Sequence, residues 1–233
     1  MRLRSGYRLA AVLLIGGLLL AAYPGISNLI YRMQTESEAE IYRSEVEDAG
    51  IDLEALWEQA RQYNRELAGA VVTMENPFAD AAQNLSGMEY RALLSVDESG
   101  RMGYIGIPEI HVYLPIYHGT EEETLLSGVG HLEGSSLPTG GSDVHTVLAG
   151  HTGLNRARIF TDLTRLEEGD RFYLYILDQT FCYEVRQIAV VEPEDVSLLK
   201  IEPGKDLCTL VTCTPYGVNT HRLLVTGERV GQE

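Results

Sequence analysis

The chain has 233 residues, 45% of them hydrophobic, which is enough for one sizeable folded domain and a smaller attached segment. Its 34 acidic and 18 basic residues give a formal net charge of −16. A surface that acidic repels phosphate backbones, which argues against nucleic acid as a partner. Three cysteines are too few for a disulfide framework, and an odd number leaves at least one free thiol.

The N-terminal segment is basic and then apolar. No charged residue occurs from Leu9 to Tyr31, a run of 23 residues that could cross a hydrocarbon layer of about 30 Å. Arginines precede this run and glutamates follow it, so the positive-inside tendency places the rest of the chain outside the cell. We assign residues 1–35 to a cytoplasmic tip and a single transmembrane anchor in the cell membrane. A cleaved signal peptide ending near Ala21 and Ala22 is the alternative, and it also predicts export.

Residues 36–72 are rich in helix formers and acids and predict an N-terminal helical region. Asp52 is its expected N-cap. Apolar side chains recur at three- and four-residue steps, as on one helix face that packs on a core: Leu53, Leu56, Trp57, Ala60, Tyr63 and Leu67. The pattern stops in residues 73–90, where Pro77 disfavours a helical Asn76 and Gly87 interrupts the remaining stretch, so this segment is predicted to be a loop.

Residues 91–233 contain short runs rich in Val, Ile, Tyr and Thr that are separated by turn residues, as in β-strands. The only helical patch lies around Arg156 to Leu166. The fold is therefore predicted to be mainly β, a closed or nearly closed barrel. The expected strands are MGYIGIP, VYLPIYHG, HTVLAGH, RFYLYIL, TFCYEVRQIAVV, LCTLVTC and HRLLVTGERV.

Cys213 is the one thiol at a junction between a strand and a loop, where one side of it can be open. The turn through Pro215 and Gly217 would bring it near Arg222, whose fork of donors suits a carbonyl or a developing oxyanion. Cys208 should point to the opposite face of the same strand, so the two cannot readily bridge. Cys182 and Cys208 are expected to be buried, and a bridge between those two is an unsupported alternative.

A cysteine nucleophile also needs an acid or base, and six histidines compete for that role. His151, in AGHTG, follows an apolar run and would project from the end of a strand. His131, in GVGHLEG, has nearly the same surroundings, and spacing alone does not separate them. His221 would point away from the face that Arg222 occupies.

The segment TLVTCTPYGVNTHRLLVTGER resembles the signature of the sortases, the membrane-anchored cysteine transpeptidases of Gram-positive bacteria. LSGVGHLEGSSLPTGG, HTVLAGHTGL and FTDLTRLEEGD resemble the class C branch, which polymerises pilins. The likeness runs from YPGISN to the last strand. It implies a closed sortase-type barrel of about eight strands over residues 91–233, preceded by N-terminal helices and a lid loop over residues 73–90.

The resemblance makes Cys213 the nucleophile, His151 the general acid/base and Arg222 the oxyanion-stabilising group, and leaves His131 a structural role. The implied substrates are pilin or surface proteins with LPXTG-like sorting signals. A thioester on Cys213 would be resolved by the lysine amine of another pilin subunit at the outer face of the cell membrane. No cofactor is implied. A calcium site among Glu192, Glu194 and Asp195 is disfavoured against a solvated acidic loop.

Class C enzymes close their cleft with a lid that carries Asp-Pro-aromatic, and Asn76, Pro77 and Phe78 match it here. Asparagine cannot form the ion pair, so a weaker latch is expected; a plain turn is the alternative. Many class C enzymes also carry a second hydrophobic segment after the last strand, where this sequence reads GERVGQE.

Two other functions stay open. A sortase that anchors surface proteins to cell-wall peptidoglycan would differ only in the amine that resolves the thioester. A tethered, non-catalytic β-barrel that binds surface proteins predicts that Cys213 forms no thioester.

Overall fold

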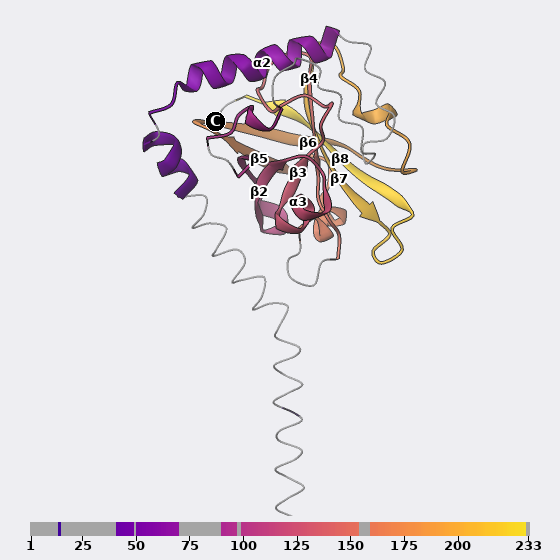
Figure 1. The fold of residues 1–233 in the computed structure, drawn as a ribbon. Helices are drawn as coiled ribbons and strands as arrows, with labels where there is room; N and C mark the ends of the chain where they lie inside the picture. Colours follow the sequence, from indigo (N-terminus) through magenta and orange to yellow (C-terminus); the bar gives the residue numbers. More distant parts are fainter. Residues whose placement is uncertain are drawn as a thin grey trace, which may run out of the picture.

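Eight strands close into a barrel in the computed structural model, which describes residues 14, 41–48, 50–69, 90–96, 99–153 and 159–231 (Figure 1). Around the barrel the order is β1-β2-β3-β4-β7-β8-β6-β5, and β5 pairs with β1 to close it. The strands are β1 Arg101–Ile107, β2 Val112–His118, β3 Val129–His131, β4 Val144–Ala149, β5 Arg171–Ile176, β6 Gln179–Val191, β7 Asp206–Thr214 and β8 His221–Val230.

Two of the eight pairings are parallel, β2 with β3 and β4 with β7, and the rest are antiparallel. The predicted mainly β barrel is confirmed, and each of the seven expected runs forms a strand. The sequence did not reveal β3, because it has three residues with a central glycine and no alternating pattern.

The barrel interior is filled by alternate side chains of the strands. Leu148 of β4, Leu210 of β7 and Val225 of β8 are fully buried in the main hydrophobic core. Their sequence neighbours on the same strands face outward, since successive side chains of a strand point to opposite sides. This alternation decides which residues the outer face of the barrel carries.

Helix α2, Leu53–Gly69, lies across one side of the barrel (Figure 1). The backbone N–H of Ala55 donates to Oδ1 of Asp52, which confirms the predicted N-cap. The predicted apolar face of α2 packs on the core, with Leu53 and Leu56 partly buried and the other four residues buried. The indole N–H of Trp57 donates to Asp178 in the β5–β6 hairpin. Asn64 donates to the Leu137 carbonyl and accepts from its N–H, which ties the helix to the loop before β4.

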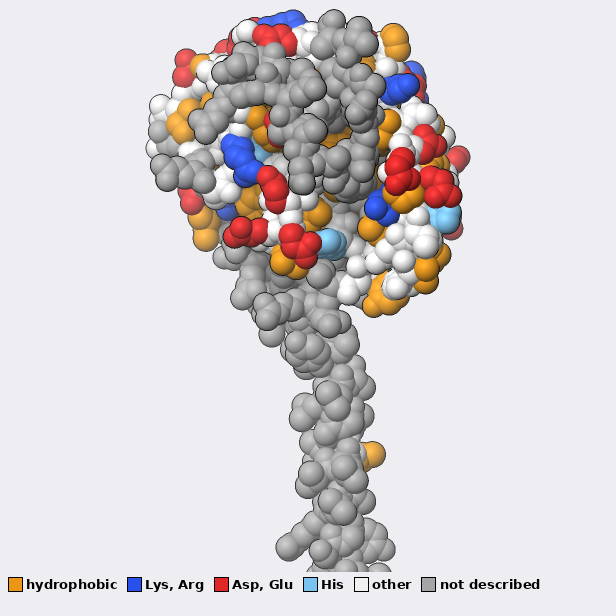
Figure 2. Space-filling view, turned by 45° about the vertical axis from the view of Figure 1, so that its right-hand side comes forward, with side chains coloured by type: hydrophobic (Ala, Val, Ile, Leu, Met, Phe, Trp, Pro, Cys, Tyr) orange, Lys and Arg blue, Asp and Glu red, His pale blue; other side chains and the backbone are white. Residues whose placement is uncertain are grey.

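The remaining described elements are short. A helix over residues 41–48 precedes α2, and α3, Glu122–Ser127, connects β2 to β3. The 3₁₀ turns are η1 Tyr90–Ala92, η2 Pro108–Ile110, η3 Thr161–Arg165 and η4 Ser197–Leu199. Acidic side chains are spread over the face shown in Figure 2, as the net charge of −16 leads one to expect.

Two predicted features fall on other parts of the chain. The lid residues Asn76, Pro77 and Phe78 lie outside the described residues, as does the predicted anchor apart from residue 14. Within the described ranges, no helix combines the length and the apolar character needed to cross a membrane.

Candidate active site

The hairpin of β7 and β8 brings Cys213 and Arg222 together. They are direct partners in the antiparallel register, so they project from the same face, and Cβ atoms in such pairs are about 5 Å apart. The turn between them is closed by the N–H groups of Val218 and Asn219, which both donate to the Pro215 carbonyl at 3.0 and 2.9 Å. The hairpin thus shortens nine positions of sequence to one strand spacing.

His151 reaches the same place from the other side of β7. Strand β4 runs parallel to β7 with Ala149 beside Val211, and the Gly150 N–H donates to the Val211 carbonyl at 3.0 Å. Two residues further along each chain stand His151 and Cys213. Because the strands are parallel, both lie at the same end of the sheet.

Hydrogen bonds fix the backbone that carries His151. The Thr212 hydroxyl donates to the Gly150 carbonyl at 2.7 Å, and the Phe160 N–H donates to the His151 carbonyl at 3.0 Å. The Phe160 ring packs where a side chain at position 150 would stand, 2.7 Å from an ideal Cβ, so only glycine fits there. No signal in the sequence indicated the hydrogen bond of Thr212.

The side chain of His151 is half-buried, and its Nε2 atom is itself buried and makes no hydrogen bond to any residue that the structure describes. An imidazole nitrogen without a protein partner can exchange a proton with a substrate amine. The Arg222 guanidinium is half-buried too, and its Nη1 donates to the carbonyls of His221 and Asn219 at 3.1 and 3.3 Å. These contacts orient the guanidinium from the turn side.

The three groups lie on the outer face of the barrel, at the end of an apolar strip. Val211 and Leu224 occupy the same face one step before Cys213 and Arg222, and they belong to a small buried cluster separate from the main core. Leu199 of η4 packs into this cluster. The segment between β6 and β7 is therefore packed against the outer face of the sheet at Val211 and Leu224.

His145 holds the segment between β6 and β7 in place at Lys200, just after η4. Its Nδ1–H donates to the Lys200 carbonyl at 2.8 Å, and its Nε2 accepts from the Thr209 hydroxyl at 2.7 Å. Burial lowers the pKa of His145, so the neutral ring that this arrangement needs is the favoured form. Sequence reasoning missed this role, because a histidine in a β-rich run carries no signal for a partner 55 residues away.

His131 lies elsewhere, fully buried, and makes structural hydrogen bonds. Its Nε2–H donates to the Ser136 carbonyl at 2.9 Å, and its Nδ1 accepts from the Tyr90 hydroxyl at 2.6 Å. Burial lowers the pKa of His131 to about 3, so it stays neutral. With its nitrogens engaged inside the protein, His131 cannot serve Cys213, in agreement with the structural role expected for it.

All three cysteines are free. Cys208 is fully buried in the core, where desolvation raises the pKa of its thiol well above the usual range, whereas Cys213 is partly exposed. The two faces predicted for this strand are therefore confirmed. No bridge joins Cys182 and Cys208.

The acidic segment after β6 approaches the start of β8. Glu192 lies 3.2 Å from Nε2 of His221. Across the residues that the structure describes, no group of three or more His, Cys, Asp or Glu side chains is placed to hold a metal ion.

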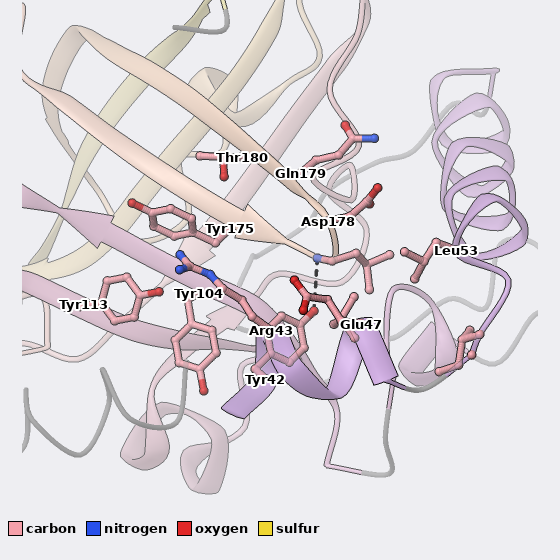
Figure 3. A pocket seen from close by; sticks show the side chains of 14 residues that line it. Tyr42, Arg43, Glu47, Leu53, Tyr104, Tyr113, Tyr175, Asp178, Gln179 and Thr180 are labelled. Carbon is pink, nitrogen blue, oxygen red and sulfur yellow. Dashed lines mark hydrogen bonds between the residues drawn. The ribbon is translucent and has the colours of Figure 1, made fainter. Parts of the chain in front are cut away.

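A cavity of about 360 Å³ lies far from this site, between residues 42–53 and strands β1, β2 and β5. Its wall is aromatic, and the Arg43 guanidinium stands 5.3 Å from the centre of the Tyr175 ring (Figure 3). Strand β6 begins at this cavity with Gln179 and ends at Val191, which pairs with Arg222. The cavity and the Cys213 thiol are thus at opposite ends of that strand.

Known proteins match both the sequence and the fold. The family model of the sortase domain matches residues 105–230 of this chain. Sortase A of Bacillus anthracis is 30% identical over 158 residues, which cover 67% of this chain and 73% of that protein.

Two solved structures extend the likeness. Sortase C of Streptococcus pneumoniae has a TM-score of 0.74 and 40% identity over 84% of this chain and 97% of that one. Sortase C-1 of Actinomyces oris has a TM-score of 0.70 and 48% identity over 76% and 98% of the two chains. The domain match covers more than half of the sequence and the barrel is shared, so the chain belongs to the sortase family of cysteine transpeptidases.

Proposed function

We propose that this chain is a class C sortase, which cleaves an LPXTG-like sorting signal and joins pilin subunits through lysine isopeptide bonds. The observation that supports the proposal is the strand register, in which Cys213 pairs with Arg222 of β8 and β7 runs beside β4, two residues beyond whose end His151 lies. The similar sortase C of Streptococcus pneumoniae, described for its catalysis and its pilin substrate specificity, supports the choice of substrate.

In the first half-reaction the Cys213 thiolate attacks the carbonyl carbon of the signal's threonine. The C–S bond forms while the carbonyl electron pair moves to oxygen, and the Arg222 guanidinium stabilises that oxyanion. When the intermediate collapses, the bond to the following residue breaks and His151 donates a proton to the departing amine. The product is a thioester on Cys213.

In the second half-reaction a lysine ε-amine of another pilin attacks the thioester carbonyl. His151, neutral after the first step, takes a proton from the attacking amine, and the C–S bond breaks to restore the thiolate. The lysine keeps the acyl group as an isopeptide bond, so atoms and charges balance over the cycle.

The proposal includes two features outside the described residues. Residues 1–35 would anchor the chain by a single pass and leave residues 91–233 on the extracellular side, in line with the apolar run from Leu9 to Tyr31. Asn76, Pro77 and Phe78 would form a lid over the cleft, with the Phe78 ring filling the place of substrate.

A sortase that anchors surface proteins to peptidoglycan is the second candidate. The similarity to sortase A of Bacillus anthracis favours it. That likeness is weaker than the 40% and 48% identity to the two sortase C structures, so the pilin amine is the preferred acceptor. The chemistry at Cys213 is the same in both cases.

Intact-mass spectrometry tests the function on the full-length chain in detergent with an LPXTG-type peptide. The expected result is a mass gain equal to the acyl part of the peptide, absent in Cys213→Ala, which keeps the buried thiols Cys182 and Cys208. A lysine-containing pilin peptide should discharge the adduct faster than a peptidoglycan-type amine. Absence of both adduct and cleavage, even with Phe78→Ala, would refute an acyl-transfer enzyme and favour the binding module.

A further inference from the structure

Tyr216 is a large aromatic side chain on the turn between β7 and β8, and 67% of it is exposed. A single exposed apolar ring needs no explanation in itself. This ring, however, is in close contact with the segment that carries His151, and it stands three residues after Cys213.

The contact is made with Gly153. An ideal Cβ on Gly153 would lie 2.9 Å from Cε2 and 3.3 Å from Cζ of Tyr216, so the ring occupies the space of the missing side chain. Gly153 also has a φ of +79°, in the left-handed region that favours glycine. The Tyr216 hydroxyl forms no hydrogen bond within the described ranges, so the contact depends on the ring.

Two hydrogen bonds fix the backbone of the segment that carries His151. Thr212 bonds the Gly150 carbonyl, and the Gly153 N–H donates to Oγ1 of Thr161 at 3.0 Å. Tyr216 adds a contact from the turn that follows the nucleophile. Contacts between the two segments thus lie on both sides of Cys213: the hydrogen bonds of Gly150 with Val211 and Thr212 before it, and the Tyr216 ring after it.

We propose that Tyr216 is a positioning residue for the transfer reaction: its ring, packed on Gly153, fixes the distance between the Cys213 thiol and the His151 imidazole. The inference rests on the proposed function, in which those two groups exchange a proton through the substrate. An aromatic ring suits the task because two side-chain torsions order a large contact surface. Displacing a reacting group by about 1 Å can slow a reaction about 100-fold.

The test compares Tyr216→Ala and Tyr216→Phe with the wild-type full-length chain in single-turnover reactions with an LPXTG-type peptide. Tyr216→Ala should form the thioester about 10- to 100-fold more slowly, with KM changed by less than about twofold. Tyr216→Phe keeps the ring and should react within about twofold of wild type. Urea unfolding should give nearly the same midpoint for all three chains, because the ring is mostly exposed.

Two glycines supply a matched pair. Gly153→Ala and Gly217→Ala place an alanine at similar positive φ values, +79° and +74°, in neighbouring segments. A Cβ at position 217 meets nothing within 4 Å, whereas one at position 153 meets the Tyr216 ring. Gly153→Ala should therefore slow thioester formation well beyond Gly217→Ala. In the Tyr216→Ala background the ring is absent. There, Gly153→Ala should slow thioester formation no more than Gly217→Ala slows it in the wild-type chain.

The outcomes separate the two proposals. If wild type acylates but Tyr216→Ala does so equally fast, or if the two glycine variants slow the reaction equally, the positioning role is wrong and the proposed function stands. A slow Tyr216→Phe would also overturn the inference, because it would assign the effect to the hydroxyl. If wild type forms no thioester, both proposals fall together.

Discussion

His131 and His151 have nearly the same sequence surroundings and opposite environments. Each follows a glycine at a strand end, yet His131 is fully buried with its nitrogens engaged, and His151 is half-buried with a free Nε2 among the described residues. The difference comes from the elements around them. Tyr90 and Ser136 enclose one ring, while the other stands where β4 ends beside the Cys213 strand. Burial and hydrogen-bond partners therefore distinguish the two histidines where spacing cannot.

The largest effect on activity is expected when the imidazole at position 151 is removed. His151→Ala should slow thioester formation by about 10²- to 10⁴-fold, the range that one general acid contributes. Its unfolding free energy should change by less than about 1 kcal/mol, since Nε2 has no partner to lose within the described chain. Single-turnover mass measurements check the first effect and urea unfolding the second. If His151→Ala forms the thioester as fast as wild type, another residue must act as the general acid.

The reverse pattern is expected at His131. His131→Ala should lower the unfolding free energy by about 2–4 kcal/mol, because it opens a cavity, removes the Nδ1 acceptor of the Tyr90 hydroxyl and leaves the buried Ser136 carbonyl without the imidazole donor. Urea unfolding beside His151→Ala provides the control. Once corrected for the folded fraction, thioester formation should stay within a few fold of wild type. A stable but inactive His131→Ala would contradict the structural role.

The pH dependence of stability sharpens the comparison further. The pKa of His131 falls from its usual 6.5 to about 3 in the folded chain. Below pH 6.5 the unfolded chain binds a proton at His131, whereas the folded chain binds it only below about pH 3. Acid therefore lowers the unfolding free energy over this window by up to about 1.4 kcal/mol per pH unit.

His131→Gln keeps a donor and an acceptor but removes the titrating group. Its unfolding free energy, measured in urea from pH 7 to pH 4, should fall less steeply with acid than that of wild type, by up to about 1.4 kcal/mol per pH unit. His118 and His145, whose pKa values burial also lowers, remain in both chains and cancel in the difference. Parallel curves would show that His131 is not the group responsible.

The smallest effect is expected for a substitution at Asn76, in the proposed lid, which lies outside the described residues. Asn76→Asp would let the proposed lid form an ion pair with a guanidinium such as Arg222, worth about 1 kcal/mol if partly exposed. Alkylation of Cys213 by iodoacetamide should then slow by a few fold, and less at high salt. Asn76→Gln, which adds no charge, is the control. An unchanged or faster rate would argue against a latch at this position.

The sequence was sufficient for elements whose pattern is local. The face of α2 and seven strands were predicted, since hydrophobic periodicity alone specifies them. Cys213 and Arg222 were predicted to lie close together because only a turn separates them in the sequence, and their pairing confirms it. His151 required a family resemblance, since its position depends on a parallel pairing that no local signal encodes.

Two kinds of feature escaped sequence reasoning. Strand β3 is too short to alternate, and its pairing depends on both neighbours. The contacts of His145 with Lys200 and of Tyr216 with Gly153 join segments remote in sequence. Such contacts follow from the closed barrel and are visible only after the chain is folded.

The two pairings that build the site also differ in how far apart their strands lie in sequence. Cys213 and Arg222 meet across one hairpin, whereas Gly150 and Thr212, bonded across β4 and β7, are 62 positions apart. Local hairpins form quickly, and distant parallel pairs form late because loop closure opposes them entropically. A folding chain should therefore bring its thiol and guanidinium together before the imidazole arrives. The arrangement of Cys213, Arg222 and His151 that the proposed transfer needs would therefore be complete only once β4 and β7 have paired.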